Sequence, residues 1–130
     1  LEVANALYRP SYISFMFALS YYQLIPETVY TITSATPRTT ATFDALGHHF
    51  VYHSLKRAAF TGYTPTLING QTIWIAEPEK ALVDSMYLAA LEHKELPERL
   101  RVQKLSKAKV RAYAKLFQHE ALLKAIEKIL

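Results

Sequence analysis

Apolar residues near the start of the chain recur at the spacing of an α-helix. Between residues 12 and 24 they fall three or four positions apart on one side, which is the period of an amphipathic helix. Ser11 or Ser14 is available as an N-cap, and Pro26 follows just past the end. The pattern predicts a largely buried helix over residues 12–24.

The next part of the chain, residues 29–76, consists of short β-branched and aromatic runs separated by turn-forming residues. Such runs are typical of strands, and Asn69-Gly70 between two apolar runs is a strong signal for a hairpin turn. We predict extended segments over residues 29–33, 40–43, 49–53, 60–67 and 71–76. The second and third of these should form one hairpin, and the last two another.

Helical periodicity returns after Pro78, where Leu82, Met86 and Ala89 recur at i, i+4 and i+7. A second helix should follow the N-cap Ser106, and a third should begin at about Glu120. The order of elements is one N-terminal helix, four to six strands and three C-terminal helices. It predicts a single α+β domain over residues 1–130 with a mainly antiparallel sheet.

Composition narrows the class of protein. The chain is 51% hydrophobic and 20% charged, which is typical of a soluble globular protein. It has no cysteine, so disulfides and thiolate metal sites are excluded, and a reducing cytoplasm fits best. Its most apolar run, ISFMFALSYYQLI, is too short to span a bilayer, and we expect no membrane partner.

The positive charge is concentrated in the last third of the chain. Residues 94–130 hold ten Lys/Arg and four Asp/Glu, a net charge of +6, whereas the remainder carries −2. A basic segment of this kind favours an acidic partner such as nucleic acid, although solvated helix faces are also often rich in lysine. Candidate phosphate contacts are Arg101 and Lys104, followed by Lys107, Arg111 and Lys115 at i, i+4 and i+8 of one helix. Like charges at this spacing repel unless something anionic offsets them.

The segment IAEPEKALVD, residues 75–84, is the one stretch that resembles an active site. It places three carboxylates and a lysine within eight residues. A magnesium-dependent nuclease of the restriction-endonuclease type needs an Asp on one strand and Glu-x-Lys on the next. Here Glu79 and Lys80 are adjacent, Glu77 lies three before the lysine, and Pro78 argues against a continuing strand.

A helix start explains the same segment better. Pro78 suits the first helical position, and Glu77 and Glu79 would lie at the positive end of the helix dipole. Lys80 and Asp84 stand four apart and can pair across one turn. Residues 81–83 should then begin the buried side of the helix.

Other catalytic and metal sites find little support. His49 and His53 share one strand face beside His48, but a zinc or copper site would need a third ligand, and we interpret them as polar residues of a half-exposed strand. Only three glycines, two aspartates and no Gly-Ser pair are present, so a P-loop, a dinucleotide-binding turn or a nucleotidyltransferase site cannot be built. We predict no catalytic residue, no cofactor and no metal.

A series of short segments carries a family resemblance. In chain order they are YIS (12–14), ALSYYQLIPE (18–27), VYTITS (29–34), TPRTT (36–40), GHHFVY (47–52) and IAEPEKALVD (75–84). Together they resemble the AbiEi-type antitoxins of bacterial type IV toxin–antitoxin systems, which serve in phage defence, over roughly residues 4–90. The family's usual glycine after SYY is Gln23 here, which affects the expected local turn.

The resemblance implies a function. Members of this family pair an N-terminal winged helix-turn-helix, which binds the operon promoter, with a C-terminal antitoxin domain. Their toxin is a nucleotidyltransferase that is countered without a stable complex. This chain resembles the C-terminal domain alone and begins without methionine, so we expect the winged helix, and with it most DNA binding, to be absent from it.

We therefore expect a non-enzymatic antitoxin domain that also supports autorepression of its operon as part of a transcriptional regulator. Two alternatives remain open. One is an accessory or dimerisation domain of a transcriptional regulator that has no toxin partner. The other is a degenerate magnesium-dependent nuclease that uses Glu77, Glu79 and Lys80.

Overall fold

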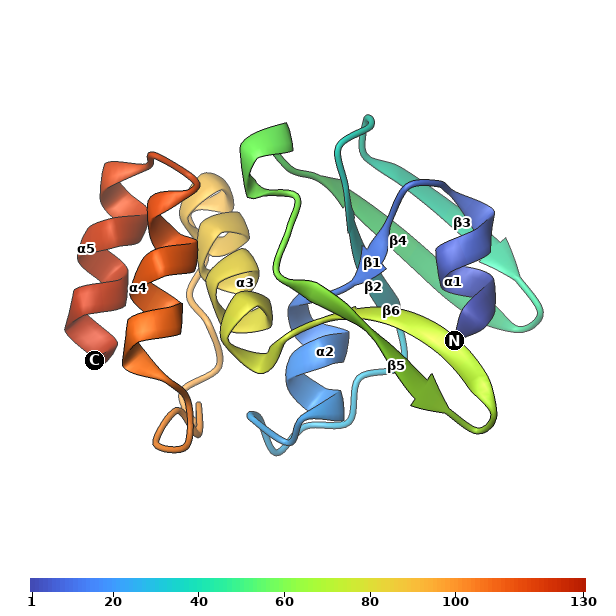
Figure 1. The fold of residues 1–130 in the computed structure, drawn as a ribbon, viewed down its shortest axis with the longest axis horizontal. Helices are drawn as coiled ribbons and strands as arrows, with labels where there is room; N and C mark the ends of the chain where they lie inside the picture. Colours follow the sequence, from blue (N-terminus) through green and yellow to red (C-terminus); the bar gives the residue numbers. More distant parts are fainter.

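A computed structural model describes residues 1–130 as an α+β fold (Figure 1). The helices are α1 (Glu2–Leu7), α2 (Phe15–Tyr21), α3 (Pro78–Glu92), α4 (Lys107–Lys115) and α5 (Glu120–Ile129), with a 3₁₀ turn at Arg57–Ala59. The strands are β1 (Tyr12–Ile13), β2 (Ile32–Thr36), β3 (Ala41–Ala45), β4 (His48–Ser54), β5 (Tyr63–Ile68) and β6 (Gln71–Ala76). The predicted fold class and the three C-terminal helices are confirmed.

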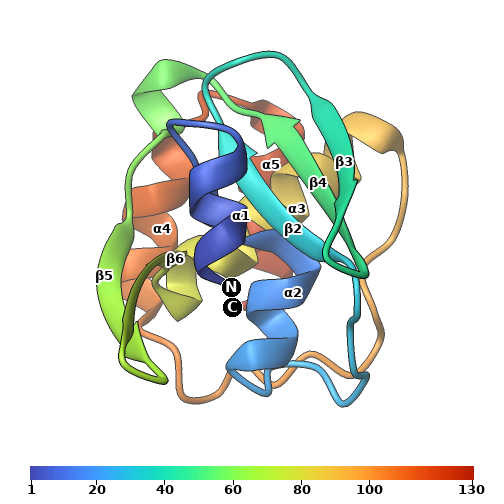
Figure 2. The ribbon, with the colours of Figure 1, turned by 90° about the vertical axis from the view of Figure 1, so that its right-hand side faces the viewer.

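All six strands form one mixed sheet in the order β3-β4-β2-β1-β6-β5. Three of the five pairings are antiparallel, namely β1 with β2, β3 with β4 and β5 with β6, while β1–β6 and β2–β4 are parallel. Figure 2 shows α1 against one face of this sheet and α3, α4 and α5 beyond the other. The mainly antiparallel sheet predicted from the turns is therefore present, and helices cover both of its faces.

The helix predicted over residues 12–24 is only partly correct. Tyr12 and Ile13 form the short central strand β1, which pairs with Ala35 and Ser34 of β2 and, through Ile13, with β6. The helix α2 begins only at Phe15. The apolar spacing of residues 12–24 favours a helix locally. At residues 12 and 13 this preference is outweighed by hydrogen bonding to two distant strands, because β1 joins the two halves of the sheet. The helix α1 lies outside every predicted element.

Both predicted hairpins form. The turn of the β5–β6 hairpin is Asn69-Gly70, with φ of 49° and 78°, as a two-residue turn of the I′ type requires. The strand expected at residues 29–33 lies slightly later, at β2. At the C-terminal side, Ser106 caps α4 by accepting a hydrogen bond from the backbone N–H of Lys109 at 3.2 Å, as predicted.

The core lies between the sheet and the C-terminal helices, and α3 runs through its centre. Residues 79–87 of α3 are all buried, because α2 contacts this helix on one side and α4 and α5 on the other. The helix α5 contributes Leu122 and Ile126 to the same core. No helix has the length and apolar character needed to cross a membrane.

Candidate functional site

The lysine and the aspartate of IAEPEKALVD lie inside the core of the protein rather than on its surface. Lys80 and Asp84 are both 0% exposed, and Lys80 Nζ lies 2.5 Å from Asp84 Oδ1. The predicted pairing across one helical turn is therefore confirmed. The expectation that the buried side begins with residues 81–83 is incomplete, because burial extends to both charged neighbours of that stretch.

Tyr12 of β1 and Ser14, the N-cap of α2, complete this buried cluster. The hydroxyl of Tyr12 donates to Asp84 Oδ2 at 2.8 Å, and that of Ser14 donates to the same oxygen at 2.7 Å. Lys80 Nζ also donates to Tyr12 Oη at 2.9 Å and to the carbonyl of Ala59 at 2.7 Å. Every polar atom of the ion pair is therefore satisfied, which a buried pair requires if it is not to destabilise the fold strongly.

Burial dominates the ionisation of this cluster. It lowers the pKa of Lys80 and raises the pKa of Asp84, while each charge partly offsets the effect on the other. Burial, followed by the Asp84 carboxylate, also raises the pKa of Tyr12. Such shifts occur at catalytic sites, but structural ion pairs produce them too. Neither Lys80 nor Asp84 lines any of five surface hollows on the molecule.

Gly62 closes the cluster on the side of β5. Its φ is +80°, and a Cβ built on it would lie 2.7 Å from Lys80 Cγ and 3.0 Å from Lys80 Cβ and Cδ. The position therefore needs glycine for two reasons, the left-handed backbone and the close approach of the lysine stem. The backbone here also carries the chain from the 3₁₀ turn towards β5.

The two glutamates of the motif fasten α4 to the start of α3. Glu77 accepts hydrogen bonds from the Tyr113 hydroxyl and from Lys109 Nζ, the latter at 3.3 Å, and the Tyr113 bond is the main cause that lowers the pKa of Glu77. Glu79 accepts from the backbone N–H of Ser106 at 3.0 Å. Glu77, Glu79 and Lys80 therefore serve separate contacts and do not converge on one point as a nuclease site would.

The histidines of β4 are also separated in role. His49 Nδ1 lies 2.6 Å from Asp44 Oδ1 on the exposed edge strand β3, whereas His53 is half-buried against the ring of Phe15, with centroids 4.9 Å apart. Burial lowers the pKa of His53. No group of three or more His, Asp or Glu side chains in the chain is arranged to hold a metal ion.

The five basic residues predicted to contact phosphate are all exposed. Lys107, Arg111 and Lys115 lie on α4, and Arg101 and Lys104 lie in the segment before it. Arg111 forms a two-bond ion pair with Glu127 of α5, with Nε–Oε2 and Nη2–Oε1 distances of 3.0 and 3.1 Å. The other four make no ion pair within the chain. Of the three like charges on α4, only Arg111 therefore has an acidic partner within the protein.

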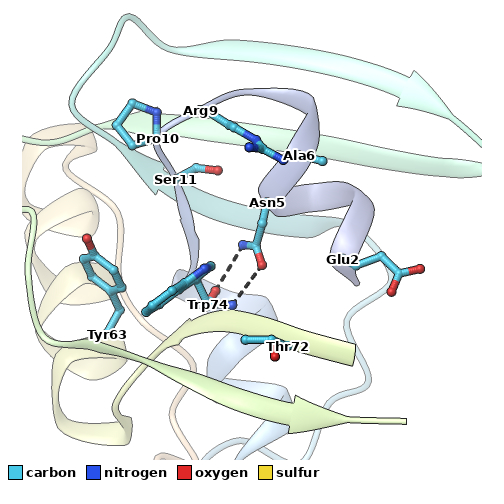
Figure 3. Close-up of a pocket in the computed structure, with 9 residues that line it drawn as sticks. All are labelled: Glu2, Asn5, Ala6, Arg9, Pro10, Ser11, Tyr63, Thr72 and Trp74. Atoms are coloured by element: carbon cyan, nitrogen blue, oxygen red, sulfur yellow. Dashed lines mark hydrogen bonds between the residues drawn. The ribbon is translucent and has the colours of Figure 1, made fainter. Parts of the chain in front are cut away.

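A hollow of about 520 Å³ lies on another side of the molecule, between the α1–β1 segment and the β5–β6 hairpin (Figure 3). The amide of Asn5 binds the free backbone edge of β6 beside it: Asn5 Nδ2 donates to the Trp74 carbonyl at 3.1 Å, and the Trp74 N–H donates to Asn5 Oδ1 at 2.8 Å. This pairing fixes α1 against the hairpin beyond the point where the two-residue strand β1 ends.

Comparison with known proteins adds no identification. No protein-family model matches the chain, and no curated protein gives a significant match.

Sequence reasoning missed two features of these sites. It placed Tyr12 on a helix and considered Ser14 only as an N-cap, a position that Ser14 does occupy before α2, so their convergence on Asp84 across about 70 residues of chain was not foreseen. It also treated Trp74 only as a strand residue. The available signal was alternation along β6, where Ile73 and Ile75 are buried and Trp74 faces outward.

Proposed function

We propose that this chain is a non-enzymatic antitoxin domain of the AbiEi type, which counteracts a nucleotidyltransferase-like toxin and supports the action of a DNA-binding domain. The observation that carries the proposal is the complete burial of Lys80 and Asp84. Neither of these two residues has a solvent-facing atom, whereas a catalytic lysine or carboxylate must reach its substrate. The same ten residues are also the segment that most strongly carries the family resemblance.

In this proposal, the exposed basic residues of the domain contact nucleic acid. Lys107 and Lys115 lie at opposite ends of α4, exposed and without an acidic partner. Exposed ammonium groups can contact the phosphates of a nucleic acid backbone, and such contacts carry no sequence information. This role fits a domain that adds affinity to sequence recognition made elsewhere.

Growth rescue tests the antitoxin role. Cells that express a nucleotidyltransferase-like toxin should stop growing, and co-expression of this chain should restore growth without a co-purifying complex. The control is the same plasmid without the chain. Continued arrest in cells that contain soluble, folded chain would contradict the proposal and favour an accessory domain that has no toxin partner.

The salt dependence of DNA binding tests the basic face. Because each phosphate contact contributes about 0.9 to the slope of log K against log salt, Lys107→Ala with Lys115→Ala should reduce the magnitude of that slope by up to about 2. The matched control is Lys94→Ala with Lys124→Ala, which removes the same charge from residues that pair with Glu92 and Glu120. Equal slopes for both double variants would show that Lys107 and Lys115 do not contact phosphate.

A further inference from the structure

The hollow beside Trp74 has an aromatic wall that is open to solvent. Trp74 is 41% exposed, and its indole meets the ring of Tyr63 edge-on, with centroids 5.8 Å apart and planes at 80°. Asn5 holds the backbone of Trp74 through two hydrogen bonds, so the strand that carries this wall is held in place before any ligand arrives. Exposed, pre-positioned aromatic rings are the surfaces on which nucleobases stack.

The charge around this wall favours an anion. Arg9 lines the hollow and its guanidinium takes part in no ion pair. The one acid among the lining residues is Glu2. Figure 3 shows Glu2 at the opposite end of the hollow from Tyr63, with its carboxylate turned away from Trp74. Figure 3 shows the Arg9 side chain ending beside Ala6, so an anionic group at that end of the hollow would meet a guanidinium that has no competing carboxylate.

A buried hydroxyl in the same hollow has no partner. Ser11 is only 8% exposed, lines the hollow, and its Oγ makes no hydrogen bond. Buried hydroxyls are almost always hydrogen-bonded, and each exception needs an explanation. Because this Oγ is itself covered, the Ser11 side chain must turn into the hollow for a polar ligand group to supply the missing partner.

We propose that this hollow binds a nucleotide, with its base stacked on Trp74, its phosphate at Arg9 and a polar edge bonded to Ser11. The volume of about 520 Å³ lies within the range of small-molecule sites, roughly 300–1,000 Å³. The nucleotide is either a free monophosphate or one unit of a single strand. The site goes beyond the proposed antitoxin role, because neither α4 nor the IAEPEKALVD cluster takes part in it.

Trp74 is the only tryptophan in the chain, so its fluorescence reports on this site directly. The chain should be titrated with AMP and UMP, and separately with a short oligouridine, under excitation at the long-wavelength edge of the indole band. We expect saturable quenching, since a stacked base quenches indole emission. Saturation by mononucleotides identifies a free nucleotide as sufficient, and saturation by the oligonucleotide alone identifies a single strand as the ligand.

Two variants with matched controls locate the binding. Arg9→Gln should weaken binding about ten-fold, because a hydrogen bond to a charged group is lost, and Ser11→Ala about three-fold. Arg99→Gln removes an exposed arginine elsewhere, and Ser34→Ala removes the other unpartnered buried hydroxyl. Both controls should bind as the wild type does. By calorimetry, which does not need the indole, Trp74→Leu should weaken binding about ten-fold or more.

Thermal unfolding of each variant separates a binding defect from a folding defect. Ser11→Ala and Ser34→Ala should unfold at or above the wild-type temperature, because each removes an unsatisfied hydroxyl. The proposal is overturned if no nucleotide gives saturable quenching. It is also overturned if folded Arg9→Gln and Ser11→Ala bind as well as their controls. Neither result would alter growth rescue, so this proposal and the antitoxin proposal fail separately.

Discussion

Replacing Lys80 alone should destabilise the protein far more than replacing Lys80 and Asp84 together. In Lys80→Met the carboxylate of Asp84 remains 0% exposed with two hydroxyl donors, Tyr12 and Ser14, and no counter-charge. Breaking a buried pair in this way costs about 3–5 kcal/mol. For a chain of this length that loss lowers the unfolding temperature by roughly 11–18 °C.

The double variant Lys80→Met with Asp84→Asn should recover most of that loss. It removes both charges, while the amide oxygen of the new residue still accepts from the two hydroxyls. We expect it to lie within about 1–2 kcal/mol of the wild type. Urea unfolding of the wild type, both single variants and the double variant completes a double-mutant cycle that measures the coupling.

The pH dependence of Lys80→Met gives an independent check. Burial already raises the pKa of Asp84 above its ordinary value of 3.8, and loss of the ammonium raises it further. A group whose pKa is raised by folding takes up a proton on folding, and its stabilising contribution is lost as pH rises through the folded-state pKa. The deficit of Lys80→Met relative to the wild type should therefore shrink as pH falls from 7 towards 4. A Lys80→Met variant within about 1 kcal/mol of the wild type at pH 7 would refute a fully buried pair.

Three further predictions concern other parts of the molecule. Gly62→Ala should lower the free energy of unfolding, measured in urea, by about 1–3 kcal/mol more than Gly70→Ala does. Both glycines have φ near +80°, but only Gly62 faces another side chain within 4 Å. Equal losses of stability would contradict the contact with Lys80. Burial lowers the pKa of His53 below 6.5, so as pH falls the unfolded state takes up a proton on this residue before the folded state does. Wild-type stability should therefore fall as pH drops through 6.5, and His53→Gln should flatten this dependence. An unchanged pH profile would show that another group causes it. Glu127→Gln releases Arg111 from its ion pair and should increase the magnitude of the slope of log K against log salt for DNA binding by about one. An unaltered slope would mean that Arg111 does not contact phosphate.

Local patterns in the sequence were enough to predict much of this fold. The Asn69-Gly70 turn, the strand after it, Pro78 at the first position of α3 and Ser106 as an N-cap all depend on residues a few positions apart. These preferences belong to the short segment itself, and the surrounding structure agrees with them. The α+β class followed from the order of such segments.

Long-range contacts account for what was not predicted. Tyr12 and Ile13 lie in an apolar pattern of helical period. They nevertheless form a strand, because they pair with β2, more than 20 residues away, and Ile13 pairs with β6, more than 60 residues away. The ion pair of Lys80 and Asp84 was foreseen from its spacing, but its burial depends on how α2, α4 and the sheet surround α3. The hollow at Trp74 likewise forms only where α1 meets the β5–β6 hairpin.

The central claim is that the charged residues of IAEPEKALVD support the core of an antitoxin domain and perform no chemistry. The most direct test is growth rescue by the Lys80→Met, Asp84→Asn double variant beside the wild type, with its folded state verified by thermal unfolding. We predict that both proteins restore the growth of cells expressing the nucleotidyltransferase-like toxin. The claim would be contradicted if the wild type restored growth while an equally abundant, folded double variant did not. That result would favour an active site at Lys80 and Asp84.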